Sequence, residues 1–155
     1  MYWFDCRVDS GGILTSMIIR DNFSHHTTLH DICSKKYIPS LQEWNYNGKL
    51  MTQIYYMNGK QENYVDPKTN KTIPALQKWN YNGKLMIQIY YIDGKKENYV
   101  DPKTNETIPA YQLWDNGQFW YREYYVNGKL ENYVDPKTNE VSPACQHRDY
   151  DGRLS

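Results

Sequence analysis

Residues 39–50 read PSLQEWNYNGKL, and residues 62–70 read ENYVDPKTN. Both stretches return almost letter for letter after Pro74 and again after Pro109. The interval from Pro39 to Pro74, and from Pro74 to Pro109, is 35 residues. A constant interval of this size is typical of a repeat architecture, in which each unit buries its apolar face only against its neighbours.

The same register divides the rest of the chain. We expect a degenerate first repeat or cap at residues 1–38, three tandem full repeats over residues 39–141, and a partial repeat at residues 143–155. The terminal units depart from the pattern because each must present one face to water. The three full repeats occupy residues 39–73, 74–108 and 109–142.

Turn residues punctuate each full repeat. The first one holds Asn47-Gly48 and Asn58-Gly59, and Asn-Gly favours a type I′ hairpin because both residues tolerate a positive φ. The DPKTN segment adds a third turn, in which proline presets φ and asparagine enters the left-handed region. Runs rich in β-branched and aromatic residues, such as residues 84–92, lie between the turns. We therefore expect three strands per repeat in an all-β, elongated antiparallel hairpin meander.

Three strand arrangements fit these turns. If all three turns are hairpins within one sheet, each repeat has an odd number of strands, and successive repeats expose opposite faces. If the stretch from DPKTN to the next proline is a looped connection, the number is even. A solenoid with one coil per repeat is the third arrangement, although paired Asn-Gly turns argue against it. Outside the repeats, Ser24 is placed to cap a short helix near residues 24–34.

Composition favours a thin sheet. The chain of 155 residues has a formal net charge of zero and a mean hydropathy of −0.89, yet 15% of it is aromatic. These values are too polar for a thick core and too aromatic for disorder. The balanced charge argues against nucleic acid as a partner. No run of about 18 to 20 apolar residues predicts a transmembrane helix.

The cysteines and the N-terminus predict an intracellular protein that is not secreted. Cys6, Cys33 and Cys145 are odd in number and lie outside a repeating framework, which favours a reducing compartment. The first twelve residues, MYWFDCRVDSGG, lack the basic and long apolar regions of a secretory signal.

The paired motifs YNGKL and YYxxGK occur at residues 46–60 and 81–95, and ENYVDPKTNEVSPA continues the pattern at residues 131–144. Over residues 39–155 the chain resembles the variant MORN repeats found in bacteria and in large DNA viruses of amoebae and algae. The resemblance implies a curved or twisted antiparallel meander without catalysis or cofactor, used for binding or assembly. The heavy use of Asn, Lys, Tyr and Ile suits a giant virus, where the protein would lie in the host cytoplasm or the virion. A lipid-associated adaptor is the alternative that the resemblance implies.

Candidate catalytic and metal-binding residues are few. His25, His26, His30 and Cys33 have metal-like spacing, but a further Cys or His pair that would complete a zinc site is missing nearby, so we expect no metal. A carboxylate pair for catalysis needs two different environments, whereas the acids here recur in one environment per repeat. We predict that the aspartates are turn residues, that the glutamates are solvated strand charges, and that the protein is not an enzyme. The recurring acids are Glu62, Glu97, Glu131, Asp66, Asp101 and Asp135.

Protein contact is the remaining class of function. An extended sheet has little interior in which to hide aromatic side chains, and exposed aromatic patches with a polar rim mark interfaces. The alternative is that these rings pack on one another along the sheet. We expect a non-enzymatic structural or scaffold protein that binds other proteins, including itself through its sheet edges. The predicted binding residues are Tyr55, Tyr56, Tyr90, Tyr91, Trp120, Tyr124 and Tyr125.

Overall fold

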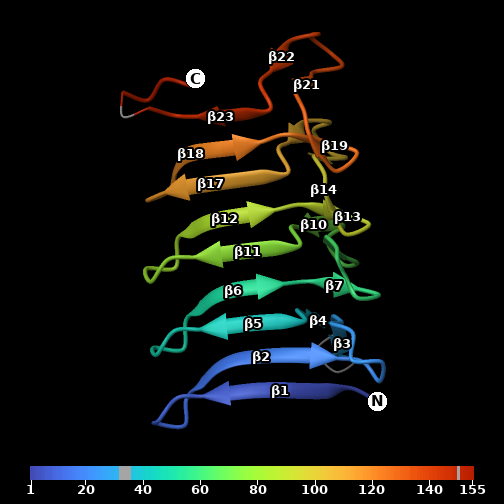
Figure 1. The fold of residues 1–155 in the computed structure, drawn as a ribbon, viewed down its shortest axis with the longest axis vertical. Helices are drawn as coiled ribbons and strands as arrows, with labels where there is room; N and C mark the ends of the chain where they lie inside the picture. Colours follow the sequence, from blue (N-terminus) through green and yellow to red (C-terminus); the bar gives the residue numbers. More distant parts are fainter. Residues whose placement is uncertain (32–35, 150) are drawn as a thin grey trace.

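The computed structural model describes residues 1–31, 36–149 and 151–155, and this part of the chain is all-β without a helix. Nine strands form one antiparallel sheet with a simple up-and-down order (Figure 1). The all-β hairpin meander predicted from the sequence is confirmed. The strands of this large sheet, in spatial order, are β1 (Trp3–Val8), β2 (Leu14–Arg20), β5 (Leu41–Trp44), β6 (Leu50–Ile54), β11 (Leu76–Trp79), β12 (Leu85–Ile89), β17 (Tyr111–Asp115), β18 (Gln118–Glu123) and β23 (Cys145–His147).

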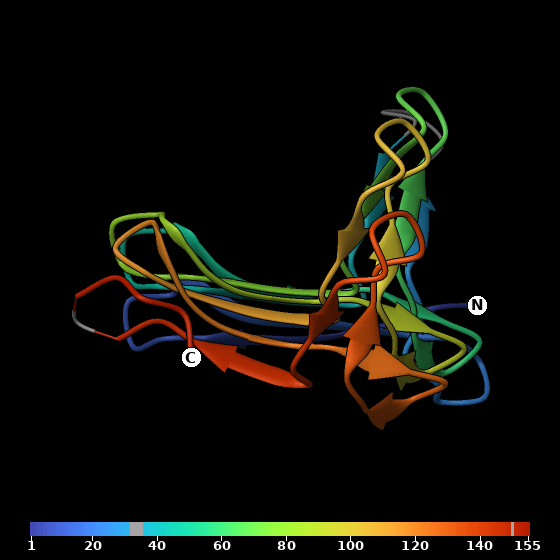
Figure 2. The ribbon, with the colours of Figure 1, turned by 90° about the horizontal axis from the view of Figure 1, so that it is seen from above.

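Small two-stranded hairpins line one end of the large sheet. Seen along the stack of repeats, the molecule is L-shaped, because hairpins such as β9–β10 stand away from one side of the sheet (Figure 2). The hairpins of the described residues are β3 (Leu29–Asp31) with β4 (Lys36–Ile38), β7 (Tyr56–Met57) with β8 (Lys60–Gln61), β9 (Tyr64–Asp66) with β10 (Lys71–Ile73), β13 (Tyr91–Ile92) with β14 (Lys95–Lys96), β15 (Tyr99–Val100) with β16 (Thr107–Ile108), β19 (Tyr125–Val126) with β20 (Lys129–Leu130), and β21 (Tyr133–Val134) with β22 (Val141–Ser142). We call the standing hairpins, among them β9–β10, β15–β16 and β21–β22, the arm.

The strand count differs from the expected three per repeat. The first full repeat gives two strands, β5 and β6, to the large sheet and four strands to two small hairpins. The number of strands that this repeat contributes to the large sheet is therefore even, as in the second predicted arrangement. The DPKTN segment, however, closes its own hairpin and is not a loop. Residues 84–92 do not form one strand, because the chain leaves the large sheet at Tyr90. Equivalent residues of successive repeats consequently point to the same face.

The second glycine turn of each repeat has the predicted geometry. Asn58 and Gly59 have φ values of 51° and 75°, which is the pattern of a type I′ turn. In the DPKTN turn, Asn70 has a φ of 53° and its N–H donates to the Asp66 carbonyl at 2.8 Å. The Asp66 carboxylate accepts from the Lys68 N–H at 2.9 Å. The predicted role of this aspartate as a turn residue is confirmed.

The first glycine turn differs from the prediction in the first full repeat. There only Gly48 has a positive φ, of 71°, so Asn47-Gly48 is not a two-residue type I′ turn. The loop is longer and is held by Asn45, whose Oδ1 accepts from the N–H groups of Asn47 and Lys49 at 2.9 and 3.0 Å. In the third full repeat the loop is one residue shorter, and there Asn116 has a φ of 50°. Removal of one residue converts the longer loop into the two-residue turn.

The helix predicted near residues 24–34 is wrong over the part of it that the structure describes. Ser24 has a φ of 64°, whereas a helix N-cap needs an extended backbone. Leu29–Asp31 is strand β3 and pairs with β4. Residues 32–34 of the predicted helix lie outside the described residues.

The core lies along the line where the chain leaves the large sheet and the arm begins, which we call the elbow. One tyrosine directly follows β6, β12 and β18, and each is at most 6% exposed. Each stacks on a tyrosine of the arm, with ring centroids 5.0 to 5.2 Å apart. These stacked pairs of tyrosine rings supply the buried apolar area that a second layer of secondary structure would otherwise supply. The pairs are Tyr55 with Tyr64, Tyr90 with Tyr99, and Tyr124 with Tyr133.

Asparagine side chains join successive repeats at the elbow. The Oδ1 atom of Asn63 accepts from the N–H of Ala75 at 3.1 Å and from the N–H of Tyr91, in the next repeat, at 3.0 Å. The N–H of Asn63 donates back to the Tyr91 carbonyl at 3.2 Å. Asn98 repeats this arrangement one unit further on. The asparagine of ENYV is therefore an inter-repeat clamp.

The neighbouring glutamates also cross between repeats. The carboxylate of Glu62 accepts from the N–H of Asp93 at 2.7 Å, and that of Glu97 accepts from the N–H of Gly128 at 3.0 Å. Each acid thus caps the type I′ turn of the following repeat. Burial raises the pKa of Glu62. The prediction that these two glutamates are solvated strand charges is wrong.

Candidate functional site

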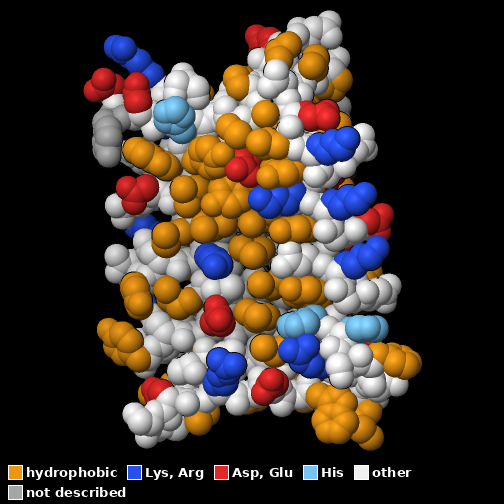
Figure 3. All heavy atoms as spheres, viewed as in Figure 1, with side chains coloured by type: hydrophobic (Ala, Val, Ile, Leu, Met, Phe, Trp, Pro, Cys, Tyr) orange, Lys and Arg blue, Asp and Glu red, His pale blue; other side chains and the backbone are white. Residues whose placement is uncertain are grey.

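Strand register separates the two faces of the large sheet. On one face, which we call the apolar face, a row of aliphatic side chains crosses the middle strands and continues through Tyr111 and Glu123 to Cys145 on β23. Hydrophobic side chains gather over the middle strands in Figure 3, with an acidic and a basic group among them. The aliphatic members of the row are Ile18, Leu41, Ile54, Leu76 and Ile89.

The opposite face carries a row of glutamines whose polar groups satisfy one another. Gln53 donates to Gln77 at 2.7 Å, and Gln88 donates to Gln112. These side-chain bonds run from one repeat to the next. Because four of these amides are already paired, this face offers fewer free polar groups than the sequence suggests. The row consists of Gln42, Gln53, Gln77, Gln88, Gln112, Arg122 and Gln146.

The apolar face changes character in the third full repeat. Tyr111 pairs with Ile89, and Glu123 pairs with Tyr111, so a carboxylate occupies the row that isoleucine occupies on β12. Tyr121 lies two residues before Glu123 and shares its face. The register therefore distinguishes the third full repeat from the first two, which have Ile54 and Ile89 at the position of Glu123.

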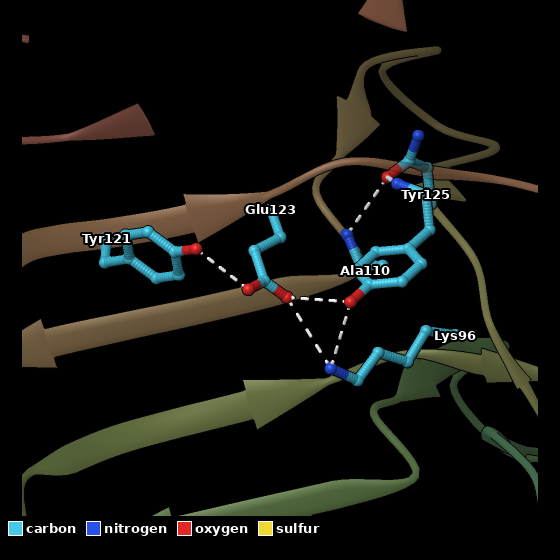
Figure 4. Close-up of polar contacts among 6 residues, drawn as sticks. Lys96, Ala110, Tyr121, Glu123 and Tyr125 are labelled. Atoms are coloured by element: carbon cyan, nitrogen blue, oxygen red, sulfur yellow. Dashed lines mark hydrogen bonds and ion pairs between the residues drawn. The ribbon is translucent and has the colours of Figure 1, made fainter. Parts of the chain in front are cut away.

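Four hydrogen-bonding groups meet at this point (Figure 4). The Glu123 carboxylate accepts from the hydroxyl of Tyr121 at 2.8 Å and from the hydroxyl of Tyr125 at 3.0 Å. Lys96, from β14 of the preceding repeat, places its Nζ 3.5 Å from the carboxylate and donates to the Tyr125 hydroxyl at 3.3 Å. The side chains of Lys96 and Glu123 are 30% and 19% exposed. The ion pair is therefore partly shielded from water.

Aromatic rings enclose the lysine. Its Nζ lies 5.3 Å from the ring centroid of Tyr111 and 5.0 Å from that of Tyr125, within the range of a cation–π interaction. Tyr121 meets Tyr111 edge to face at 5.9 Å. We call Lys96, Tyr111, Tyr121, Glu123 and Tyr125 the Lys96–Glu123 cluster.

Contacts at the cluster shift the pKa values of Tyr121 and Lys96 upward. A hydrogen bond with the Cys145 thiol, then burial and Glu123, raise the pKa of Tyr121. Burial alone would lower the pKa of Lys96, but Tyr125 and Glu123 outweigh it and raise that pKa. An amine nucleophile needs a lowered pKa, so this lysine is held as a cation. The cluster consequently presents a cation beside two hydroxyl groups that donate to Glu123, an arrangement that suits the orientation of a bound molecule.

The structure divides the predicted binding residues into two groups. Tyr55, Tyr90 and Tyr124 are buried in the elbow, so their prediction as surface residues is wrong. The other four are half-buried, and their role in binding stays a prediction; Tyr125 alone belongs to the Lys96–Glu123 cluster. These four are Tyr56, Tyr91, Trp120 and Tyr125.

Sequence reasoning missed Lys96, Tyr111, Tyr121 and Glu123. The available signal was a departure from the repeat, since tyrosine stands at position 111 where the earlier repeats have Leu41 and Leu76.

The histidines with metal-like spacing make separate contacts. His26 stacks on Tyr56 at 4.8 Å, and His30 packs against Tyr37 at 4.6 Å. His25 lies 3.6 Å from the Asp21 carboxylate. Cys33 lies outside the described residues. Among the residues that the structure describes, no group of three or more His, Cys, Asp or Glu side chains is placed to hold a metal ion.

No protein-family model, no curated protein and no solved structure matches this chain. The MORN resemblance therefore stays a prediction from the motifs. Within residues 1–31, 36–149 and 151–155, no helix is long and apolar enough to cross a membrane.

Proposed function

We propose that this chain is a non-enzymatic repeat protein whose apolar face binds or assembles with other proteins. The supporting observation is that this face holds one aliphatic row beside the Lys96–Glu123 cluster, and that hydrophobic side chains gather on it in Figure 3. A surface with an apolar centre and a few oriented polar groups has the composition of a protein interface.

The energetics of the apolar face support the same proposal. The large sheet is a single layer, so side chains such as Leu41, Leu76 and Leu113 remain only half-buried. Burying apolar surface against a partner stabilises a complex by about 25 cal/mol per Å² removed from water, before the costs of association. A second layer supplied by a partner would complete the burial that the fold leaves unfinished. The ammonium group of Lys96 would then fix the orientation of that partner.

The proposal extends to the class of scaffold. Paired glycine turns that repeat every 34 or 35 residues support a MORN-type assembly protein, and the composition rich in Asn, Lys, Tyr and Ile supports an origin in a large DNA virus. In that setting the chain would act inside the host cell or within the virion.

Two matched substitutions test the use of the apolar face. Ile87 lies on that face in β12, and the next residue, Gln88, lies on the opposite face. We expect Ile87→Lys to release the tagged chain from its native assembly in extracts of the source cells, measured by size-exclusion chromatography. Gln88→Lys is expected to leave the assembly intact. Thermal melting of both variants would show that each remains folded.

Two results would contradict the proposal. One is a wild-type chain that elutes from these extracts as a free monomer, and the other is an equal effect of the two substitutions. Co-sedimentation with anionic vesicles that weakens at high salt would instead assign the function to a lipid surface.

A further inference from the structure

The first strand of the large sheet has a free edge. No described element lies outside β1 in the sheet order (Figure 1). All six residues of β1 are exposed, with Trp3 at 59%, Phe4 at 53% and Val8 at 60%. An open edge with large apolar side chains is a template for another strand.

The other edge of the sheet is partly covered by the chain itself. The N–H of His147, in β23, donates to the Ser155 carbonyl at 3.1 Å, and the Ser155 N–H donates back at 3.0 Å. Arg148 and Leu154 form a further antiparallel bridge. The edge at β1 has no comparable cover among the described residues.

The hydrogen bonds of β2 show which backbone N–H and C=O groups of β1 point away from the sheet. The N–H of Ile19 donates to the Ser40 carbonyl, on the side of β5, at 2.7 Å. Backbone groups of successive strand residues alternate in direction, so those of Ile18 point toward β1. Ile18 pairs with Asp5, and Asp5 therefore points inward.

The same alternation fixes the rest of β1. The backbone N–H and C=O groups of Trp3, Asp5 and Arg7 point toward β2. Those of Phe4, Cys6 and Val8 point away from the sheet. The N–H of Asp9 donates to the Ile13 carbonyl at 2.9 Å, which agrees with an inward direction for the odd-numbered residues.

The sequence of β1 is complementary to itself in the antiparallel direction. Residues 3–9 read WFDCRVD. When Cys6 of one molecule lies opposite Cys6 of another, Phe4 faces Val8 and Asp5 faces Arg7. Opposite charges and apolar pairs directly across a strand pair are stabilising. The outward-pointing Phe4, Cys6 and Val8 also meet one another, which the hydrogen-bond pattern requires.

Other registers of the same pairing are less favourable. A register centred on Asp5 places two aspartates opposite each other, and one centred on Arg7 places two arginines opposite each other; like charges in that position are destabilising. A shift by a single residue would pair outward-pointing groups with inward-pointing ones. Registers centred on Phe4 or Val8 also satisfy the hydrogen bonds without opposing like charges, but each of them pairs fewer residues of β1. The register centred on Cys6 combines opposite charges across the strand pair with a longer overlap than either of these two.

We propose that β1 pairs with β1 of a second copy of this chain about a twofold axis at Cys6, joining the two nine-stranded sheets into one. The odd number of strands supports this partner, because β1 and β23 run in the same direction and head-to-tail stacking would pair them in parallel. The twofold axis is perpendicular to the sheet, so the apolar faces of both molecules lie on the same side. Dimerisation thereby doubles the surface on which a partner could dock.

Charge reversal tests the register. We expect the purified wild-type chain to form a concentration-dependent dimer in sedimentation equilibrium. Asp5→Arg and Arg7→Asp, made singly, each place like charges opposite each other and should give monomers. Mixing the two single variants restores opposite charges at both pairs and should give a heterodimer, detected by a size tag on one of them. The double variant should again form a homodimer.

Three outcomes would overturn the proposal. They are a monomeric wild-type chain at the highest soluble concentration, single variants that dimerise like the wild type, or single variants that fail to combine although circular dichroism shows both folded. Mild oxidation of a variant with Cys6 as its only cysteine supplies an independent readout. A disulfide-linked dimer is expected, since the two Cα atoms of a hydrogen-bonded antiparallel pair are about 5.5 Å apart. Its absence would count against a twofold axis at Cys6.

Discussion

Replacing Asn98 by alanine removes one inter-repeat clamp. The lost Oδ1 atom accepts from the N–H groups of Ala110 and Tyr125 at 3.1 and 3.0 Å. The backbone bond from the Asn98 N–H to the Tyr125 carbonyl, at 3.3 Å, does not depend on the side chain. The substitution therefore leaves two backbone donors at the elbow without their acceptor, while the strands of the large sheet keep their own hydrogen bonds.

The expected cost follows from these two donors. An intramolecular hydrogen bond contributes about 1 kcal/mol net, and a buried donor left without a partner costs about 1 to 3 kcal/mol. Ala110 is fully buried and Tyr125 is half-buried, so we expect Asn98→Ala to lower the free energy of unfolding by about 2 to 4 kcal/mol. Asn132, in the last full repeat, is exposed, and within the described part of the chain its side chain accepts from Ala144 alone. Asn132→Ala should cost about 1 kcal/mol.

Urea denaturation measures both costs, and amide hydrogen exchange locates them. A loss of 2 to 4 kcal/mol corresponds to roughly 30-fold to 1,000-fold faster exchange at the amides of Ala110 and Tyr125. Asn98→Asp is the matched control, since it keeps an acceptor oxygen and should retain most of the stability. Equal losses in Asn98→Ala and Asn132→Ala, or unchanged exchange at Ala110 and Tyr125, would refute the clamp.

Three further predictions concern the elbow, the turns and the Lys96–Glu123 cluster. Burial raises the pKa of Tyr90 from its ordinary value of 10.0 to about 12. Because this tyrosine ionises at a lower pH in the unfolded chain, the stability that it contributes below pH 10 should be lost as the pH rises through 12. Ultraviolet difference absorbance should show this late ionisation. Gly128→Ala should cost more in thermal melting than Gly83→Ala, because both glycines have a positive φ but only the new Cβ at position 128 would lie 2.9 Å from a lysine side chain; an equal cost would contradict this. A double-mutant cycle between Lys96 and Glu123 should give a coupling free energy of about 0.5 to 1 kcal/mol, since the pair is partly exposed. A cycle without measurable coupling would show that the ion pair does not stabilise the cluster.

The hairpin architecture could be predicted because it is encoded by local residues. Asn58-Gly59 forms its turn from the φ preferences of two adjacent positions, and the DPKTN turn is set by Pro67 and Asn70 in the same way. The elbow could not be predicted in this manner. Residues 84–92 look like one continuous strand, and only the packing of Tyr90 against Tyr99 shows where the chain leaves the large sheet.

The cluster and the clamps were missed for a related physical reason. Lys96 and Glu123 belong to different repeats and meet only because the small hairpin β13–β14 lies against the neighbouring strands. Glu62 looks like an ordinary solvated acid in the sequence, yet its acceptor role depends on a turn about one repeat away. Contacts between repeats depend on the stacking geometry, which a motif within one repeat does not specify.

The most direct test of the repeat account is the removal of one whole unit, residues 74–108. Joining Ile73 to Pro109 reproduces the junction of Ile73 with Pro74 and restores an Asn63 clamp to the following repeat. The account predicts that the shortened chain folds cooperatively, with the β-sheet circular dichroism of the full-length protein, whereas removal of five fewer residues abolishes folding. A shortened chain that is unfolded, or one that tolerates both deletions equally, would contradict a fold built from interchangeable stacked repeats.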